Sequence, residues 1–323
     1  MTLTPELKLE LLRKMLRARL FEEKIVAVYP EQDMKTPVHL YIGQEAVAAG
    51  VSQHLKTEDY VFSTHRNHGH YLGKGAEMKP IVAELYGRAT GCAKGKGGSM
   101  HFVDVSKNCP GTTAIVGGSI PLGAGAALAI KLKGEAGRIS VAYFGDGASD
   151  EGVLQETLNF SALHKLPVLF ICENNFYATN SPQKARHAEG VISKRAPGFG
   201  IPSSLTDGND VEAVWEAAGK AVEHVRSGKG PYFMEFPTYR WKGHVGPDCD
   251  WEKGCRPKDE FFEWVKKCPV EGYIKKLSAA GALSEERLAA MKGEIGAEIE
   301  AAWAYAKASP LPAPEELYAD VYN

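Results

Sequence analysis

The sequence has little of what marks secreted, disulfide-bonded or nucleic-acid-binding proteins. It contains six cysteines in 323 residues, and no two of them have Cys-x-x-Cys spacing. A chain of this length needs no disulfides to hold a core, so we expect a reduced, cytoplasmic protein. The 38 basic and 40 acidic residues leave a net charge of −2, which gives no electrostatic reason to expect nucleic acid as a partner.

Long apolar runs that could cross a membrane are also missing. The first residues lack the apolar core of a signal peptide. Residues 108–130 carry no charge, but Pro110, Pro121 and five glycines interrupt them. Because a bilayer-spanning helix needs about 20 mostly apolar residues without such interruptions, we interpret this stretch as a buried loop that enters a helix of small residues. We expect no membrane partner.

Helical periodicity dominates both ends of the chain. Leucines and other apolar residues recur at three- and four-residue steps over residues 3–29, which predicts an N-terminal helix that ends at Pro30. Residues 76–90 predict another helix, and residues 257–323 a helical C-terminal extension. We expect these to be appendages of a single domain that spans residues 1–323.

The centre of the chain alternates strands and helices. Residues 138–144 form a continuous apolar strand, residues 150–164 a helix, and residues 167–172 a second strand. This βαβ unit predicts a parallel sheet with a right-handed crossover. A further helix at 210–227 and a strand at 231–236 continue the alternation, so the fold class is α/β.

Polar residues follow both central strands at the points where they end. Asp146 follows the first strand and Asn174-Asn175 the second. Ligands of parallel sheets bind at this edge, and neighbouring strands lie about 4.8 Å apart. A carboxylate and an amide oxygen suit Mg²⁺ with a diphosphate, which Gly145 and Gly147 would let approach the backbone. The alternative is that Asp146 caps a helix and the asparagines form a turn.

Several motifs in order carry a family resemblance. Gly145-Asp146-Gly147, followed after 26 residues by Asn174-Asn175, is similar to the thiamine-diphosphate motif. Other matching segments are residues 39–46, 65–70, 95–101 and 239–244. Over about residues 5–275 the chain resembles the alpha subunit of the decarboxylating component of 2-oxo acid dehydrogenase complexes, of the pyruvate and acetoin types. The resemblance implies the thiamine-diphosphate-binding fold, a parallel sheet with helices on both faces.

The resemblance also implies ligands for thiamine diphosphate and Mg²⁺. The metal ligands would be the side chains of Asp146 and Asn175 and the main-chain carbonyl of Tyr177. Arg66 would contact the diphosphate, as a planar cation does. The full set of implied cofactor-binding residues is Arg66, His65, Ala114, Val116, Gly145, Asp146, Gly147 and Asn175.

Three histidines match positions at the substrate end of the cofactor in the family, namely His39, His68 and His244. Histidine suits catalysis there because its charge changes near neutral pH, and it can pair with a carboxylate or donate to an oxyanion. His65 departs from the tyrosine of many pyruvate-type members and agrees with acetoin-type members. Ala114 replaces a glycine of some members, and no serine comes directly after His244.

The resemblance further implies partner proteins. The glutamate that activates the aminopyrimidine ring of the cofactor would come from a separate beta subunit in an α₂β₂ assembly. The substrate would be a small 2-oxo acid or acetoin, and the acyl unit would pass to a lipoyl carrier, for which a lipoyl acyltransferase is a possible partner.

Two alternatives to this function remain open, and two nucleotide-binding alternatives match the sequence poorly. A heteromeric thiamine-dependent transferase could pass an acyl or aldehyde unit to another acceptor such as a sugar, and a scaffold subunit would not be catalytic. Residues 123–128 imitate a dinucleotide fingerprint with no clear strand before them, and residues 91–97 imitate a phosphate-binding loop with the wrong spacing.

Overall fold

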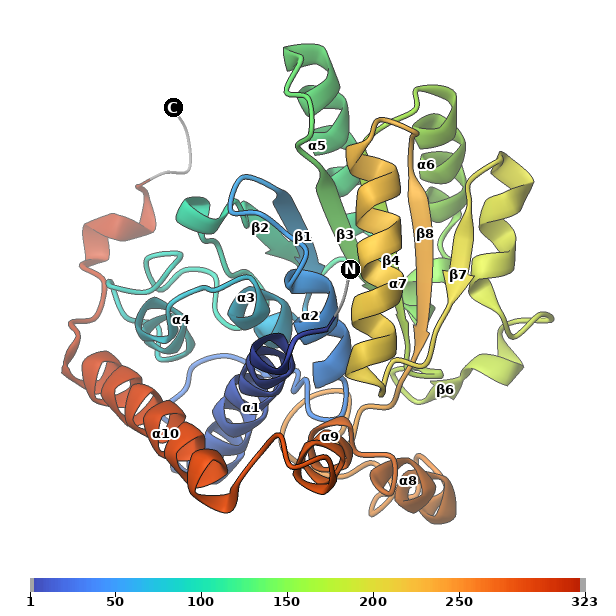
Figure 1. Cartoon of the computed structure of the whole chain (residues 1–323). Helices are drawn as coiled ribbons and strands as arrows, with labels where there is room; N and C mark the ends of the chain where they lie inside the picture. Colours follow the sequence, from blue (N-terminus) through green and yellow to red (C-terminus); the bar gives the residue numbers. More distant parts are fainter. Residues whose placement is uncertain (1–2, 320–323) are drawn as a thin grey trace.

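The fold is built on a six-stranded sheet (Figure 1). The computed structural model describes residues 3–319, so residues 1–2 and 320–323 of the expected domain and C-terminal extension lie outside the described residues. The strands run in the order β2-β1-β3-β4-β8-β7, and every neighbouring pair is parallel. Their bounds are β1 Tyr60–Thr64, β2 Gly111–Thr113, β3 Ser140–Gly145, β4 Val168–Asn174, β7 Ser203–Leu205 and β8 Tyr232–Pro237. A separate antiparallel pair consists of β5 Tyr177–Ala178 and β6 Ser181–Pro182. The predicted parallel α/β sheet is confirmed.

Helices occupy the segments where they were predicted, and two further helices, within residues 45–52 and 68–73, were not predicted. Their bounds are α1 Pro5–Val28, α2 Glu45–Ser52, α3 His68–Gly73, α4 Met78–Leu85, α5 Ser119–Lys133, α6 Gly152–Leu163, α7 Val211–Arg226, α8 Lys258–Val265, α9 Pro269–Ala279 and α10 Glu285–Ala308. Thr4 caps α1 by accepting a hydrogen bond from the backbone N–H of Leu7 at 3.3 Å. The helix expected to begin at Asp150 begins at Gly152 instead, because Asp146–Asp150 form a 3-10 turn.

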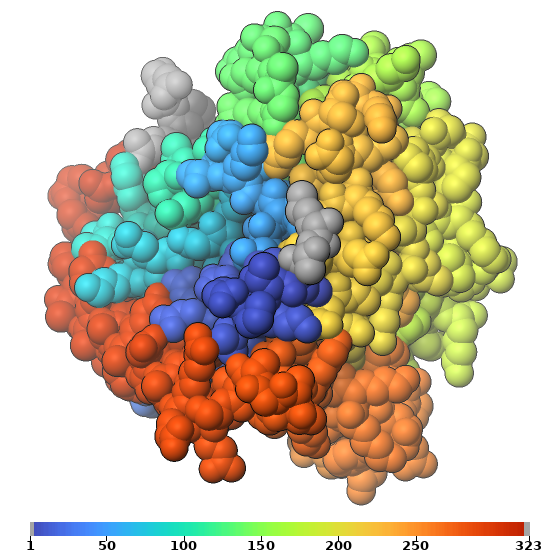
Figure 2. Space-filling model, viewed as in Figure 1, coloured from blue at the N-terminus to red at the C-terminus, as the bar shows by residue number. Residues whose placement is uncertain are grey.

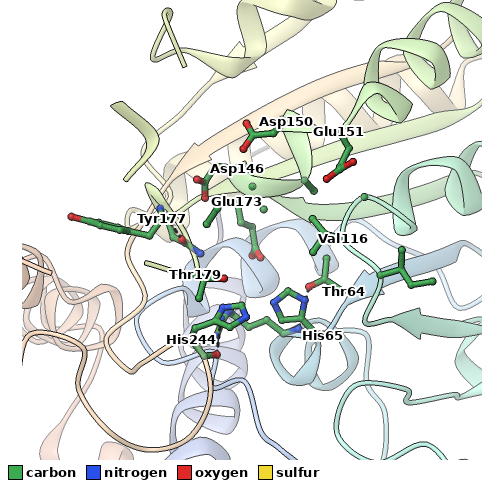
Figure 3. Close-up of a pocket in the computed structure, with 18 of the residues that line it drawn as sticks. Thr64, His65, Val116, Asp146, Asp150, Glu151, Glu173, Tyr177, Thr179 and His244 are labelled. Carbon is green, nitrogen blue, oxygen red and sulfur yellow. Dashed lines mark hydrogen bonds between the residues drawn. The ribbon is translucent and has the colours of Figure 1, made fainter. Parts of the chain in front are cut away.

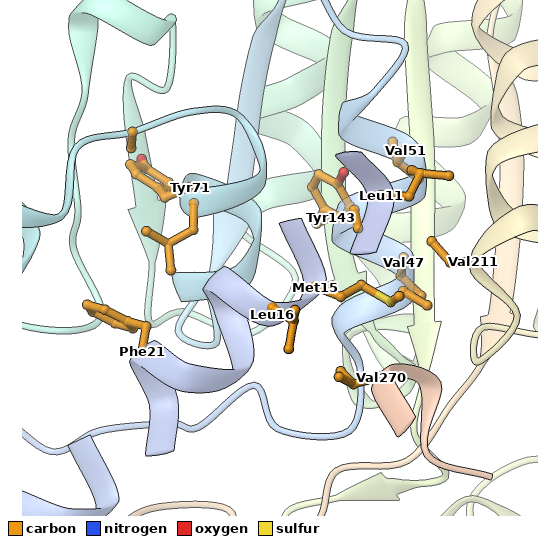
Figure 4. Packing of buried hydrophobic residues seen from close by; sticks show 14 of the residues in the cluster. Leu11, Met15, Leu16, Phe21, Val47, Val51, Tyr71, Tyr143, Val211 and Val270 are labelled. Carbon is orange, nitrogen blue, oxygen red and sulfur yellow. The ribbon is translucent and has the colours of Figure 1, made fainter. Parts of the chain in front are cut away.

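The sheet separates two hydrophobic cores, because alternate side chains of a strand point to opposite faces. In β3, Val141 and Tyr143 belong to one core, and Ala142 and Phe144 to the other. The first core includes buried residues of α1, α2 and α7 (Figures 1 and 4), and the second includes those of α5 and α6. Helices therefore cover both faces, as expected.

The two ends of the chain pack together. Helices α1 and α10 lie side by side (Figure 1), joined by ion pairs that include Arg13–Glu294, Arg17–Glu298 and Lys24–Glu300. In the space-filling view, α9 and α10 cover the lower border of the visible face beside α1 (Figure 2). Within residues 3–319, no helix is both long enough and apolar enough to span a bilayer.

Candidate active site

A pocket of about 320 Å³ opens at the carboxyl ends of β1, β3 and β4. Its residues come from the sheet edge and the adjoining loops (Figure 3), as expected for an open parallel sheet. They are Gln44, Thr64, His65, Arg66, Ile115, Val116, Gly117, Gly145, Asp146, Gly147, Ala148, Asp150, Glu151, Glu173, Asn175, Tyr177, Ala178, Thr179 and His244. Most of the residues predicted for the site therefore lie around one cavity.

Asp146 and Asn175 stand at neighbouring strand ends. The β3–β4 register pairs Gly145 with Glu173, so the residues that come after these strands meet at one edge. Both side chains are buried, and the Asn175 Nδ2 donates to Gln44 Oε1 at 3.0 Å. That bond fixes the orientation of the amide. The alternative role of Asp146 as cap of the next helix does not hold, because α6 has no side-chain cap. The asparagine turn does form, since Asn174 Oδ1 accepts from Phe176 N at 3.1 Å.

Tyr177 contributes its main chain rather than its ring to the pocket. The phenol points away from the cavity (Figure 3), and its hydroxyl donates to Glu260 Oε1 at 2.8 Å. Burial and the hydrogen bond to Glu260 raise the pKa of Tyr177 to about 12. The ring thus anchors the turn that carries the backbone of residue 177 along the pocket wall, which suits the expected carbonyl ligand.

Arg186 supplies the positive charge beside Asp146. Its guanidinium contacts both Asp146 and Asp150, and His187 also contacts Asp150. Burial raises the pKa of Asp146, while Arg186 acts in the opposite direction. Arg186 therefore stabilises the ionised form of a buried carboxylate. The oxygen donors of the site are those that Mg²⁺ prefers. Arg186 could not be predicted for the site, because no motif links it to Asp146.

The two glycines after β3 have different surroundings. A Cβ on Gly147 would lie 2.8 Å from the Cβ of Ala178, so only glycine lets the turn pack against β5. A Cβ on Gly145 would meet only the Glu173 carbonyl oxygen, at 3.9 Å. Both residues line the pocket, as predicted.

Arg66 is a buried cation that has no acidic partner among the residues the structure describes. Its Nη1 donates to the Leu40 carbonyl at 2.6 Å, its Nη2 to the His244 carbonyl at 3.4 Å, and no described carboxylate forms an ion pair with it. Burial and the neighbouring Arg240 lower the pKa of Arg66 to about 9. A guanidinium buried in this way fits an anionic ligand group such as a diphosphate.

Histidines form the opposite end of the pocket. His65 and His244 lie together, away from Asp146 and Asp150, with Glu173 between the two groups (Figure 3). His39 does not line the cavity itself but packs behind them, with ring centroids 4.6 Å from His65 and 5.0 Å from His244. Burial lowers the pKa of His244 to about 4 and of His65 to about 3.

His68, for which a catalytic role is expected, is not among the residues that line the pocket. Its ring is fully buried and outside the pocket, with Nδ1 2.9 Å from Glu22 Oε1 and Nε2 2.8 Å from Ser99 Oγ. Both nitrogens are engaged, so no lone pair or N–H is left for a substrate. His68 instead ties α1 to α3 and to the loop at Ser99.

Ala114, for which a cofactor contact is expected, is likewise not among the residues that line the pocket. The loop places Ile115, Val116 and Gly117 along the pocket and leaves Ala114 outside it. Ile115 and Val116 keep 76% and 50% of their surface exposed, which is unusual for side chains of this kind. The absence of charge over residues 108–130 indicated a buried loop, but it did not show which residues of that loop face the cavity.

Glu173 is a pocket residue that the sequence motifs did not identify. It receives a hydrogen bond from the Tyr41 hydroxyl, and its Oε1 lies 3.1 Å from His70 Nε2. The other ring nitrogen of His70 lies 2.7 Å from Ser63 Oγ. This buried network holds the end of β4, and the only signal for it was the position of Glu173 directly before the asparagine pair.

Neither nucleotide-binding alternative survives. Residues 123–128 lie inside α5 rather than at a strand-to-helix turn. The backbone N–H groups of the 91–97 loop, including those of Ala93, Gly95 and Gly97, donate to the carboxylate of Glu84. The loop therefore already encloses an anion from its own chain and has no free cradle for a phosphate.

Comparisons with known proteins identify the family of the chain. A family model described as "Dehydrogenase E1 component" matches residues 13–315. The chain is 40% identical to the alpha subunit of acetoin:2,6-dichlorophenolindophenol oxidoreductase from Bacillus subtilis, with 100% of this chain and 95% of that protein covered. It is 41% identical to the pyruvate dehydrogenase E1 component subunit alpha of Zymomonas mobilis, with 97% and 88% covered. The resemblance read from the motifs is confirmed: this chain belongs to the dehydrogenase E1 component family.

Proposed function

We propose that the chain is the alpha subunit of a thiamine-diphosphate-dependent dehydrogenase that acts on a small 2-oxo acid or acetoin. One observation carries the proposal. A buried carboxylate and amide, from Asp146 and Asn175, share a pocket with the buried guanidinium of Arg66, which forms no ion pair within residues 3–319. Oxygen donors for a hard cation and a cation for an anion, lining one pocket, suit a magnesium-bound diphosphate.

In this proposal, different pocket residues bind the metal, the diphosphate and the ring system of the cofactor. Asp146, the Asn175 side chain and the Tyr177 carbonyl hold Mg²⁺, and Arg66 pairs with the diphosphate. Gly145 and Gly147 leave the backbone open to the phosphates, while Val116 offers an apolar surface for the ring system. When bound, thiamine diphosphate supplies a nucleophilic carbon and an electron sink for cleavage beside a carbonyl group.

The histidine end of the pocket receives the substrate. His65 and His244 are neutral at pH 7, because burial and Arg66 lower their pKa values. Neutral imidazoles donate hydrogen bonds to a carbonyl oxygen and accept a proton from a hydroxyl group. His39 supports the two rings from behind. These roles serve a 2-oxo acid and acetoin alike.

The site needs a partner chain to become complete. The matched relatives are named as alpha subunits, and exposed apolar residues, Ile115 and Val116, border the pocket. We assign the missing side of the pocket to a beta subunit that supplies the activating glutamate in an α₂β₂ assembly. A lipoyl acyltransferase is the acceptor protein of this proposal.

Cofactor binding by the co-expressed alpha and beta chains tests the proposal. Calorimetry with thiamine diphosphate and Mg²⁺ should show tight binding to the wild type and a loss of at least 100-fold for Asp146→Ala, because a central metal ligand is removed. Asp33→Ala, at an exposed position outside the pocket, is the matched control and should bind normally.

The same complex identifies the substrate. A panel of 2-oxo acids and acetoin with an artificial electron acceptor should show turnover of at least one of them. Wild-type cofactor affinity in Asp146→Ala would refute the site. Tight binding without turnover of any panel member would favour an acyl transferase, and no cofactor binding by the wild-type complex would favour a scaffold subunit.

A further inference from the structure

Three imidazoles meet at the end of the pocket away from Asp146. His39 precedes α2, His65 follows β1, and His244 follows β8. Their ring centroids are 4.6 Å, 5.0 Å and 5.2 Å apart. One ring nitrogen from each lies within 4.8 Å of the corresponding atoms of the other two. Three separate elements thus bring three potential ligand atoms to one point.

None of these rings has a hydrogen-bond partner within residues 3–319. The Nδ1 of His39 is buried and unpaired, on a side chain that is only 5% exposed. Buried polar atoms are normally satisfied, and an orphan usually has a functional explanation. By contrast, His68 and His70 have both ring nitrogens engaged. The ring nitrogens of the cluster are therefore available to bind a ligand, whereas those of His68 and His70 are already engaged.

The rings keep their lone pairs at neutral pH. Burial is the main cause that lowers the pKa of His39 to about 2, of His65 to about 3 and of His244 to about 4, and Arg66 acts in the same direction. A neutral imidazole is the common nitrogen ligand of zinc, copper and nickel. Protonation does not compete with a metal ion here until the solution is strongly acidic.

The charges around the cluster restrict which cation it can take. Arg66 and Arg240 face it, and Asp250 neutralises Arg240. Glu22 and Glu173 act on Arg66 from further away. The cluster contains no carboxylate, so it lacks the oxygen ligands that hard ions such as Mg²⁺ or Ca²⁺ require. The nearby guanidinium also weakens the affinity for any cation.

We propose that His39, His65 and His244 form a binding site for a divalent transition-metal ion of the zinc class. Three nitrogen ligands leave the fourth position of a tetrahedral ion open to water or a carboxylate. With Zn–N bonds of about 2.0–2.1 Å, ligand nitrogens lie roughly 3.3 Å apart, so the rings must turn inward by about an ångström. An ion there occupies the histidine end of the pocket. The proposal does not depend on the proposed function.

Titration of the metal-free full chain with Co²⁺ tests this site. A tetrahedral ion bound by three imidazoles gives intense visible absorption, which we expect to saturate at one equivalent. Zn²⁺ should abolish the signal by displacement, and a thousandfold excess of Mg²⁺ should not. His65→Asn and His244→Asn should each weaken Co²⁺ binding at least tenfold.

A surface histidine provides the matched control. His164 is exposed at the end of α6, outside the cluster, so His164→Asn should bind Co²⁺ as the wild type does. Circular dichroism of each variant checks the fold, and X-ray absorption on the Zn²⁺ form counts the imidazole ligands independently. The absence of saturable binding, or binding unchanged in both cluster variants, would overturn the proposal.

Discussion

At the scale of single residues, the pocket has an acidic end and a histidine end. Asp146 and Asp150, paired with Arg186, carry charge at the first end. On the other side the imidazoles are neutral because burial penalises their protonated forms. This division underlies our proposal that the cofactor phosphates and the metal bind at the first end and the reacting carbonyl group at the second.

The pH dependence of stability should reveal the buried imidazoles. An unfolded histidine has a pKa of about 6.5, while that of His65 is lowered to about 3 in the folded chain. The unfolded state therefore binds more protons below pH ~6.5, and the free energy of unfolding falls as the pH falls. We expect His65→Asn to reduce this fall between about pH 6.5 and 5 in urea titrations.

An exposed histidine serves as the reference for that experiment. His164→Asn, at an exposed position outside the pocket, is the variant with which the pH slope of His65→Asn is compared. A slope in His65→Asn identical to that of the wild type would show that His65 is protonated in the folded protein at pH 5.

Arg186 supports a second prediction at this scale. In Arg186→Ala the buried carboxylate of Asp146 loses its cation, so its pKa should rise further and the chain should lose about 1–3 kcal/mol at pH 7. Mg²⁺ with diphosphate should then raise the melting temperature more in the variant than in the wild type. Lys194→Ala, which removes an exposed pair with Glu189, should change stability by well under 1 kcal/mol. An equal response to Mg²⁺ would contradict the competition between Arg186 and the metal.

Residues next to strand ends were predictable, and those brought in by tertiary contacts were not. Asp146 and Asn175 could be placed because residues located just after parallel strands gather at the carboxyl edge of the sheet. Arg186 reaches Asp146 from 40 residues away along the chain, and no spacing rule predicts that contact. His68 carried the same motif signal as His244, but only packing shows that Glu22 and Ser99 already hold it.

At the scale of elements, a strand could be predicted from the sequence only where it was long enough and buried on both faces. β3 and β4 are continuous apolar runs buried on both faces, and β8 has the same pattern. β1 was hidden in a histidine-rich stretch, and β2 and β7 have only three residues each. Such short strands form because neighbouring strands provide hydrogen-bond partners, and their own sequence carries too few residues to show a period.

Two glycines of α5 allow a direct test of how this helix packs on β3. A Cβ on Gly123 would lie 2.7 Å from the Cβ of Ala142, whereas a Cβ on Gly125 would meet nothing within 4 Å. Gly123→Ala should therefore force α5 away from the sheet and cost about 1–3 kcal/mol. Gly125→Ala should be neutral or stabilise by up to about 1 kcal/mol, because alanine favours helix. Urea denaturation of both variants measures the difference, and equal stabilities would contradict the close helix–sheet contact.

At the scale of the whole molecule, the helices that hold the two ends of the chain together are separate from the pocket. The packing of α1 against α10 involves no residue of the pocket lining. The pocket border, in contrast, carries exposed apolar side chains. Ile115 and Val116 on the loop and Leu122 near the start of α5 expose between 49% and 76% of their surface. Apolar side chains left exposed together at the mouth of a binding site mark the face that a partner covers.

The last prediction concerns this face and the proposed beta subunit. Leu122→Asp places a charge where we expect the partner to bury an apolar side chain, and should weaken assembly at least tenfold in light-scattering titrations. The alpha chain itself should stay folded, because Leu122 is 49% exposed and an acidic residue near the start of α5 suits the helix dipole. Leu205→Asp, at a similarly exposed leucine on the edge strand β7, is the matched control and should assemble normally. Normal assembly of Leu122→Asp, or equal losses in both variants, would place the beta subunit on another face.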